Sequence, residues 1–317
     1  MRHNLPRLGG RPWTSVLLGV TMLVLASACG KSNTPSGGGP TPKSTQSIQV
    51  TKDATLAAEV PSDIMSKGSV TVAVDASYAP NEFFGADNKT IEGWDVDLGQ
   101  AIGTVLGVNF NFEEAGFDTI IPGLSSGKYD IGMSSFTDNK EREMTVDMVT
   151  YFSAGTSFYV KAGSGVNIGT LDDLCGHTVA VEKGTTQLDD STAQSKKCTD
   201  AGKPAVKVSA FPDQNGANLA LSSGRAEVGM ADSPVAAYQV KLSNGQFMLS
   251  GQPYGVAPYG IAVARPAGTA AGMAPMSKPI LDALMKLISD GAYMQILVKW
   301  GVEAGAITNP VINGAVS

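Results

Sequence analysis

The sequence has few of the residues on which several function classes depend. Histidine occurs only as His3 and His177, which excludes a metal site built from several histidines. Lysine and arginine together number 23 against 29 acidic residues, and no segment concentrates basic side chains. Nucleic acid is therefore not expected as a partner, because its phosphates are bound by basic patches. A chain of 317 residues is still long enough to fold as two domains.

The amino terminus lacks a hydrophobic run that would span a membrane comfortably, since its apolar stretch covers only residues 16–26. Arg2, Arg7 and Arg11 precede this stretch with no acidic residue, which is typical of a signal peptide and places one in residues 1–28. Without these three arginines the rest of the chain has 20 basic and 29 acidic residues, a net charge of −9.

Cysteine is also rare, with three in the chain, and the first follows the apolar stretch directly. Ala26-Ser27-Ala28-Cys29 resembles a bacterial lipobox in which Ala26 replaces the usual leucine. We expect cleavage after Ala28 and lipidation of Cys29, with an ordinary signal peptide cut at the same bond as the alternative. Residues 29–60 would then be the lipidated cysteine and a flexible tether, because residues 30–60 are rich in Ser, Thr, Pro, Gly and Lys.

Beyond residue 60 the pattern alternates between short buried strands and amphipathic helices, which is typical of an α/β fold. Strands are expected near residues 70–74, 108–112, 129–133, 178–181, 205–211, 227–230 and 261–264. Helices are expected over residues 98–106, before Gly127, over residues 213–223 and from about residue 280 to Trp300. The acids Asp95 and Asp97 fit the first turn of one such helix and do not indicate a glycosidase.

One segment of this pattern occurs twice, 97 positions apart. Residues 124–135, LSSGKYDIGMSS, match residues 221–232, LSSGRAEVGMAD, position for position. Each copy reads as a helix end, a glycine, a basic residue, a short strand and a polar loop, which predicts two similar lobes facing a shared cleft. Ser135 in the first copy corresponds to Asp232 in the second, and Arg142 follows the first copy. A guanidinium and a carboxylate in one cleft suit the two charged ends of a free α-amino acid.

The first copy, continued to Arg142, resembles the carboxylate-binding motif of the polar amino-acid-binding proteins that serve ABC importers, solute-binding protein family 3. Residues 93–98, GWDVDL, resemble the family's GFDVDL segment, and residues 184–186 resemble its GTT turn. The resemblance covers about residues 63–302. It implies a two-lobed α/β fold of the periplasmic-binding-protein type (type II), in which the chain crosses twice between lobes. Lobe 1 would comprise residues 61–152 and 259–317, and lobe 2 residues 153–258.

The resemblance also implies a set of ligand-binding residues. It assigns the ligand carboxylate to Arg142, Thr137 and Thr186, the ammonium to Asp232 and Ser135, and the side chain to Tyr78 and Phe117. Asp75 and Glu182 follow equivalent strands of the two lobes, so both are candidates for the distal end of the ligand. The alternatives are a surface arginine with local ion pairs, a helix-capping role for Asp232, core packing for the aromatic residues and solvent exposure for the loop acids.

The function implied is capture of one amino acid by hinge closure and delivery to a membrane permease with its ATPase, with no catalysis, cofactor or metal. The protein would be a monomer, attached by lipid to the extracytoplasmic face of the cell membrane. A cationic ligand is favoured because Asp75 and Glu182 supply two acids, while Arg142 is committed to the carboxylate. A neutral polar ligand such as glutamine is the next choice. An enzyme on the same scaffold, resembling cyclohexadienyl dehydratase, and a ligand sensor are the alternatives.

Cys175 and Cys198 remain, and both lie in the second lobe of a chain expected to be exported. A disulfide between them is therefore expected, with two buried free thiols as the alternative. The chain-entropy estimate for such a bridge is roughly 3.5 kcal/mol of stabilisation.

Overall fold

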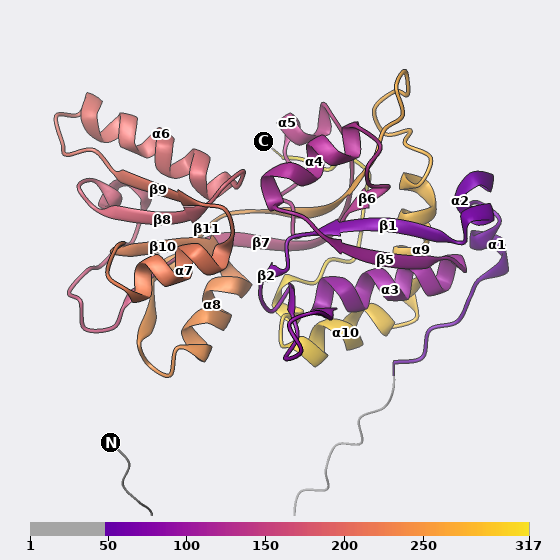
Figure 1. The fold of residues 1–317 in the computed structure, drawn as a ribbon, viewed down its shortest axis with the longest axis horizontal. Helices are drawn as coiled ribbons and strands as arrows, with labels where there is room; N and C mark the ends of the chain where they lie inside the picture. Colours follow the sequence, from indigo (N-terminus) through magenta and orange to yellow (C-terminus); the bar gives the residue numbers. More distant parts are fainter. Residues whose placement is uncertain (1–47, 317) are drawn as a thin grey trace, which may run out of the picture. The chain divides into compact units, whose positions relative to one another are not determined.

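The fold is organised around one long sheet that runs through both lobes (Figure 1). The computed structural model describes residues 48–316, so the expected signal peptide, Cys29 and the first part of the tether lie outside the described residues. The sheet has the strand order β5-β1-β6-β11-β7-β10-β8-β9. Its strands are β1 (Ser69–Val74), β5 (Asn109–Glu114), β6 (Ile131–Gly132), β7 (Asp147–Lys161), β8 (Thr178–Glu182), β9 (Lys207–Phe211), β10 (Val228–Asp232) and β11 (Phe247–Val263).

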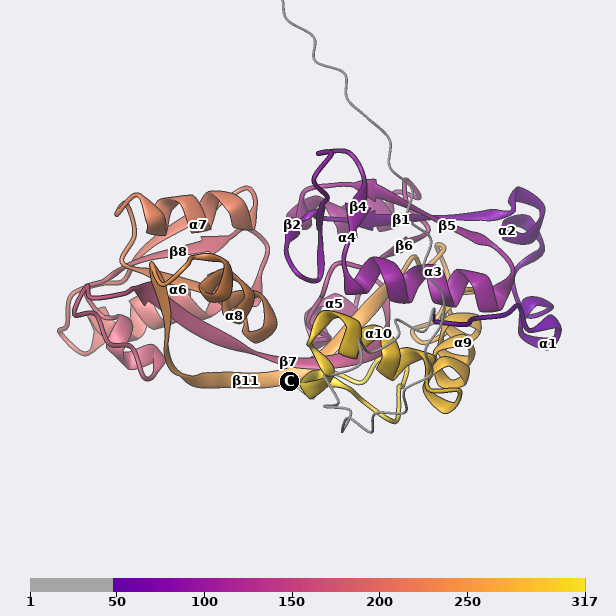
Figure 2. The same cartoon turned by 90° about the horizontal axis from the view of Figure 1, so that it is seen from below.

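Two long antiparallel strands, β7 and β11, join the lobes (Figure 2). On one side β1 pairs in parallel with β5 and β6, and on the other β8 pairs in parallel with β9 and β10. The expected lobe boundaries fall inside the two joining strands, where Ser153 pairs with Pro258. Parallel strands end at the same edge of a sheet, so β1, β6, β8 and β10 direct their carboxyl ends toward the space between the lobes.

Helices cover both faces of the sheet in each lobe (Figure 1). The first lobe has α1 (Ala54–Ala57), α2 (Ser62–Lys67), α3 (Trp94–Leu106), α4 (Phe117–Ser125), α5 (Lys140–Glu143), α9 (Ser277–Ser289) and α10 (Ala292–Trp300). The second lobe has α6 (Thr186–Asp200), α7 (Gln214–Ser222) and α8 (Ser233–Leu242), with the 3₁₀ turn η1 (Leu171–Leu174). A small sheet of β2 (Ser77–Tyr78), β3 (Glu82–Phe84) and β4 (Ile91–Glu92) precedes α3, and the 3₁₀ turn η2 (Glu303–Gly305) follows α10.

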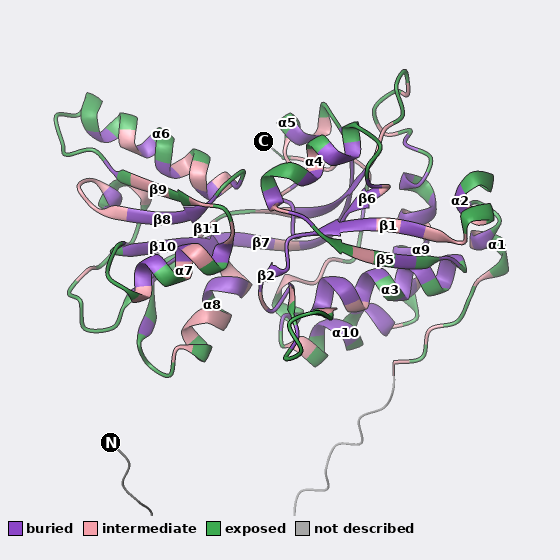
Figure 3. Ribbon diagram, in the orientation of Figure 1, coloured by how far each residue is buried: buried purple, intermediate pink, exposed green. Residues whose placement is uncertain are grey.

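The inner strands β1, β7, β8 and β10 are mostly buried because helices pack on them, and they are purple in Figure 3, whereas the edge strands β5 and β9 are more exposed. In the first lobe, apolar side chains of β1, α3, α9 and α10 form one core around the fully buried Trp94. In the second lobe, Val179, Val228 and Met230 pack with Phe158 of β7. The largely apolar character of the inner parallel strands β1, β8 and β10 follows from this two-sided cover.

Three expectations differ from the structure. The tether was expected to reach residue 60, but Asp53 caps α1, and Ile48, Val50 and Leu56 pack against the first core. Burial of these apolar side chains stabilises the packing of this segment, and α1 contacts α3 and α9. The Ser- and Thr-rich composition of the segment gave no sign of this packing. The final helix is divided into α9 and α10 by Gly291, whose φ of +78° is left-handed. The strand expected over residues 129–133 pairs only over Ile131–Gly132.

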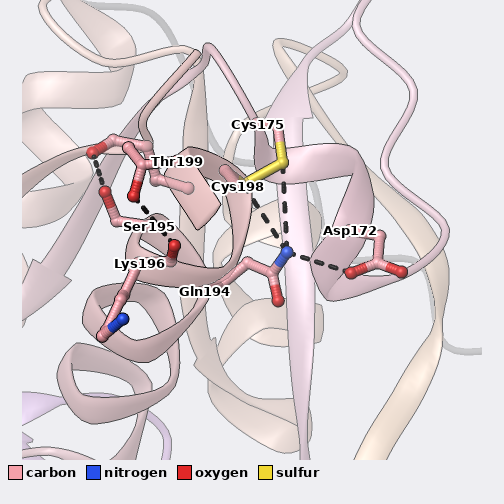
Figure 4. Close-up of a disulfide and its surroundings, with 8 residues drawn as sticks. Asp172, Cys175, Gln194, Ser195, Lys196, Cys198 and Thr199 are labelled. Carbon is pink, nitrogen blue, oxygen red and sulfur yellow. Dashed lines mark hydrogen bonds between the residues drawn. A yellow bond between two sulfur atoms is a disulfide. The ribbon is translucent and has the colours of Figure 1, made fainter. Parts of the chain in front are cut away.

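A disulfide joins Cys175, at the end of η1, to Cys198 of α6, with Cα atoms 5.7 Å apart (Figure 4). The side-chain amide of Gln194 lies beside both sulfur atoms and donates to Asp172 Oδ1 at 3.0 Å. The bridge ties α6 to the loop beneath it. It therefore supports α6, whose first residue, Thr186, lines the cavity between the lobes.

None of the helices within residues 48–316 has both the length and the apolar character that crossing a membrane requires.

Candidate ligand-binding site

A narrow cavity of about 10 Å³, with room for little more than the centre of one water molecule, lies where the two lobes meet. All nine predicted ligand-binding residues line it: Asp75, Tyr78, Phe117, Ser135, Thr137 and Arg142 from the first lobe, and Glu182, Thr186 and Asp232 from the second. Its lining also includes Ser134, Thr185 and Gln187, which the sequence interpretation did not identify. The side chains come from strand ends and helix starts, as expected for a site at the carboxyl edge of parallel strands.

Arg142 is held in α5 by the cap residue Asn139, whose Oδ1 accepts from the Arg142 N–H at 2.9 Å. Its guanidinium donates to the Thr137 carbonyl at 2.8 Å and, across the cleft, to the Gly184 carbonyl at 3.0 Å. Burial lowers the pKa of Arg142 to about 10, so the group stays charged at neutral pH. A guanidinium has five N–H donors, so donors remain for a ligand carboxylate after these two bonds.

The Arg142 guanidinium also lies over two aromatic rings. Its Cζ is 5.4 Å from the ring centre of Phe117 and 5.2 Å from that of Phe136. These rings stack on each other, with centres 4.4 Å apart and planes 19° apart. Cation–π contact and packing thus fix the plane of the guanidinium before a ligand arrives. The sequence interpretation placed Phe117 in the cavity but missed Phe136, although it lies between Ser135 and Thr137.

Asp232 ends β10 and occupies the cap position of α8, yet its side chain makes no capping bond. Its Oδ1 accepts from Gln187 Nε2 at 2.8 Å, and its Oδ2 accepts from the Tyr259 hydroxyl at 2.7 Å. Burial raises the pKa of Asp232, and these hydrogen bonds together with Arg142 oppose that rise. The carboxyl group of Asp232 therefore lines the cavity and does not cap α8, which was the structural alternative for this residue.

Gln187 and Tyr259 are hydrogen-bond partners of Asp232 that the motif did not reveal. Gln187 Nε2 joins Asp232 to Thr156 Oγ1, each at 2.8 Å. The signal for Gln187 was its place directly after Thr186 at a helix start. Tyr259 lies in β11, and no local pattern distinguishes it from other buried aromatic residues.

Ser135 adopts a left-handed backbone with φ of +54°, which a non-glycine residue rarely does without support. The support comes from buried acids. Asp95 Oδ2 accepts from the Ser135 N–H at 3.1 Å and from its hydroxyl at 3.2 Å, and Glu82 Oε1 accepts from the Ser134 hydroxyl at 2.9 Å. Ser134 Oγ in turn accepts from the Asp75 N–H at 3.0 Å.

Glu82 and Asp95 are both fully buried and lie against each other. Burial and the neighbouring Asp95 raise the pKa of Glu82 well above its usual range. Burial likewise raises the pKa of Asp95 to about 7, against the hydrogen bonds from Tyr151 and Ser135. Two carboxyls in a shared dry site cannot both ionise at low cost, so the pair retains a proton near neutral pH.

Tyr78 lies in the cavity lining, and its hydroxyl accepts from the Asp232 N–H at 2.9 Å. A second bond between the lobes runs from the Gln214 N–H to Ser77 Oγ at 3.0 Å. With the bond from Arg142 to Gly184, these contacts hold the lobes together. The structure therefore has a closed cleft.

The second lobe contributes the start of α6. Thr185 is the cap residue, with its hydroxyl accepting from the Leu188 N–H at 3.2 Å, and Thr186 is the first helical residue. Backbone N–H groups in a first helical turn lack intrahelical acceptors and favour an anion. Thr186 and Arg142 line the same cavity, and both suit the binding of a carboxylate.

Asp75 and Glu182 lie at the ends of β1 and β8 and each is only 2% exposed. Asp75 accepts from the Ser77 and Phe117 N–H groups at 3.1 and 3.0 Å. Its carboxyl also shares a side-chain hydrogen bond with Glu182. Burial, followed by the charge of Asp75, raises the pKa of Glu182 well above its usual range. Within residues 48–316 no group of three or more histidine, cysteine or acidic side chains has the arrangement of a metal site.

Comparison with known proteins finds relatives over most of the chain. The model of the bacterial extracellular solute-binding proteins, family 3, matches residues 70–303. The arginine-binding protein ArgT of Corynebacterium glutamicum is 32% identical over 259 residues, 81% of this chain and 82% of that protein. The ABC transporter glutamine-binding protein GlnH of Bacillus subtilis is 30% identical over 292 residues, 90% of this chain and 94% of that protein.

Solved structures show the same two-lobed fold. An ancestral arginine-binding protein bound to arginine has a TM-score of 0.65 and 35% identity, over 74% of this chain and 98% of that one. The ancestral amino-acid-binding protein AncCDT-1, a precursor of cyclohexadienyl dehydratase, has a TM-score of 0.63 and 32% identity, over 78% of this chain and 99% of that one. The chain belongs to family 3 of the bacterial extracellular solute-binding proteins.

Proposed function

We propose that this protein captures a free amino acid, preferably a cationic one, and delivers it to an ABC importer. The observation that carries the proposal is the placement of Arg142 and Asp232 in one cavity. One comes from each lobe, and they carry opposite charges. Arg142, with Thr137 and Thr186, would bind the ligand carboxylate, while Asp232 and Ser135 would bind its ammonium group.

The preference for a cation rests on the acids at the other strand ends. Asp75 and Glu182 are both buried in the cavity lining, and Arg142 is the basic side chain among the described residues that line it. A ligand guanidinium or ammonium would satisfy both carboxyls, whereas a ligand carboxylate would meet like charge. Tyr78 and Phe117 would cover the aliphatic part of the ligand.

The relatives support the same class of ligand. ArgT is named an arginine-binding protein, and GlnH is named a glutamine-binding protein. The ancestral arginine-binding protein has been solved with arginine and also with glutamine. Arginine, lysine or ornithine is therefore the first choice for this chain, and a neutral polar amino acid such as glutamine is the second.

Competition binding tests the order. A labelled arginine probe should be displaced by arginine and lysine at lower concentrations than by glutamine or glutamate. Stronger displacement by glutamine or glutamate would overturn the two-acid pocket while leaving the amino-acid site intact. Asp75→Asn sharpens the result, because it should weaken binding of a cationic ligand far more than binding of an amide.

Catalysis on this scaffold is the second candidate, favoured by the raised pKa of Glu182, which suits a general acid. AncCDT-1, described as an ancestral amino-acid-binding protein and a precursor of cyclohexadienyl dehydratase, supports testing this candidate. Mass spectrometry of the ligand after incubation with the protein separates the two functions. We expect the mass to be unchanged, and conversion of the ligand would establish an enzyme.

Delivery to a permease further requires the protein to stay at the membrane. The lipobox-like sequence before Cys29 supports a lipid anchor, and the chain up to the first described residues would serve as the tether. The protein would then act as a monomer on the extracytoplasmic face, with the permease and its ATPase as partners. Growth with a clickable fatty acid should label the wild-type protein and not Cys29→Ala. An unlabelled wild type would contradict the anchor.

A further inference from the structure

We propose that Asp75 and Glu182 share a proton in the closed, ligand-free form of the protein and that a cationic ligand displaces it, so that capture of the cation by this form releases about one proton. The inference rests on the proposed amino-acid-binding function and adds a linkage between ligand charge and pH. It starts from the position of the two side chains, which face each other across the closed cleft from the ends of β1 and β8.

The hydrogen bonds assign the proton to Glu182. Each oxygen of Asp75 accepts from a backbone N–H, one from Ser77 and one from Phe117, which favours the ionised form of Asp75. Glu182 has no comparable support, because its Oε1 is buried without a hydrogen-bond partner. The bond between the two carboxyls therefore runs from a protonated Glu182 to an ionised Asp75.

The surrounding charges leave the proton in place. Glu182 is faced by Asp75, by Asp213 at the start of α7 and by Asp232 at the end of β10. The buried hydroxyls of Tyr78 and Tyr159 also lie within its electrostatic reach. Asp75 is further approached by Asp213, Glu82 and Glu114. All these neighbours are acidic or neutral.

The nearest cations are directed elsewhere. Arg142 is bonded to the carbonyls of Thr137 and Gly184, and the acids that act most strongly on it include Asp232, Asp189 and Glu141. Lys183 follows Glu182 in the chain but is exposed. A ligand cation would therefore be the first positive charge to reach the Asp75–Glu182 pair.

Binding then reverses the balance at Glu182. The protonated carboxyl and the incoming cation become an ion pair between carboxylate and cation, and the proton passes to the buffer. The ligand-bound protein holds fewer protons than the free protein, so affinity rises with pH. The affinity for the cation rises by at most about tenfold per pH unit. This dependence covers the range between the pKa of Glu182 with ligand and its raised pKa without ligand. A neutral amino acid leaves the proton on Glu182.

Calorimetric titration in two buffers of different ionisation enthalpy, phosphate and Tris, counts the released protons at one pH. We expect about one proton per arginine or lysine at pH 7 and close to none per glutamine. The comparison with glutamine is internal, because all three ligands carry the same α-ammonium and α-carboxylate. The wild-type measurement stands without any variant.

The variant Glu182→Gln keeps the shape and removes the titrating group. It should abolish the buffer dependence with arginine and weaken arginine binding about tenfold or more, with a smaller effect on glutamine. Glu113→Gln is the control for a change of charge, because this exposed residue lies on β5 in the first lobe, the lobe of Asp75, and should leave proton release unchanged. Glu114→Gln tests the rival source, since partial burial, with help from Asp75 and Asp213, raises the pKa of Glu114 to about 7.

The outcomes distinguish the inference from the function. Tight arginine binding without proton release overturns the shared proton and leaves the cationic preference intact. Proton release that persists in Glu182→Gln, or disappears in Glu114→Gln, overturns the assignment to Glu182. Failure of arginine to bind while glutamine binds overturns the proposed cationic preference, and the inference with it.

Discussion

The two copies of the repeat begin alike, but the second ends in the acid Asp232 and the first in the neutral Ser135. Each passes from a helix end through a left-handed glycine, Gly127 with φ of +75° and Gly224 with φ of +76°, into a strand of the sheet. The second copy continues in β10 to Asp232, whose extended backbone leads directly into α8. The first copy pairs only over Ile131–Gly132 and then turns at Ser135.

This difference decides which charge each lobe offers. In the second lobe the acid is the last residue of the strand and is positioned by the sheet itself. In the first lobe the chain must turn back so that α5 can carry Arg142 to the cavity. A repeated scaffold can therefore present opposite charges when one strand is shortened and followed by a turn.

The residues that end the two copies also depend on different supports. Asp232 is held by Gln187 and Tyr259, whose side chains donate to it. Ser135 is held by Asp95 and Glu82, a pair of fully buried acids. The first support fixes a charge in the cleft, and the second fixes a turn in the backbone. Disturbing the two supports should therefore affect different properties.

The largest expected effect comes from making the second copy like the first. Asp232→Ser removes the carboxylate opposite the ligand ammonium, and leaving that ammonium unpaired in a closed cleft should weaken arginine binding by about 10²- to 10³-fold. Calorimetric titration measures the change, and circular dichroism checks that the variant is folded. Normal arginine affinity in a folded variant would show that the second copy does not bind the ammonium.

A smaller effect, on stability rather than affinity, should follow from Glu82→Gln. The pKa of Glu82 is raised well above its usual range and that of Asp95 to about 7, so the folded protein holds more protons than the unfolded chain above about pH 4. The pair contributes most stability below that pH and loses it as pH rises through 7. The wild type should therefore lose more Tm between pH 5 and pH 8 than the variant, by roughly a few degrees. Equal losses would contradict the shared-proton support of Ser135.

The smallest effects are expected at the basic residues that occupy equivalent positions in the repeat. Lys128 lies over the ring of Tyr129 and Arg225 over that of Phe211, and both side chains are exposed. Lys128→Ala and Arg225→Ala should change the free energy of unfolding by no more than about 0.5 kcal/mol. Arginine affinity should stay the same within error. A large loss of affinity in either variant would mean that the repeat positions a second basic residue in the site.

The sequence was sufficient for the parts of the site that local pattern determines. The repeat placed Asp232 and Ser135 at strand ends, and Arg142 followed from its distance to the first copy. Strand and helix positions such as β1 and α3 followed from apolar spacing and from Gly107, which ends α3 in the left-handed conformation. These features depend on residues close together in the chain.

The rest depends on contacts between distant segments. Asp95 was interpreted as a helix-start acid, which it is, but its burial beside Glu82 arises only when β3 packs against α3. Tyr259 reaches Asp232 because β11 returns along β7. The packing of Ile48, Val50 and Leu56 similarly depends on a core that includes residues of α9, far along the chain. Composition and periodicity contain no information on such contacts between distant segments.

In the proposed site Arg142, which follows the first copy, binds the ligand carboxylate, and Asp232, which ends the second copy, binds the ammonium. Titration with arginine, agmatine, which lacks the carboxylate, and guanidinovaleric acid, which lacks the α-amino group, tests this assignment most directly. In the wild type both truncated ligands should bind about 10²-fold or more weakly than arginine. In Arg142→Ala, arginine and agmatine should bind within about threefold of each other, and in Asp232→Ser the same should hold for arginine and guanidinovaleric acid. If Arg142→Ala still discriminates arginine from agmatine as strongly as the wild type, the carboxylate is bound elsewhere and the account is wrong.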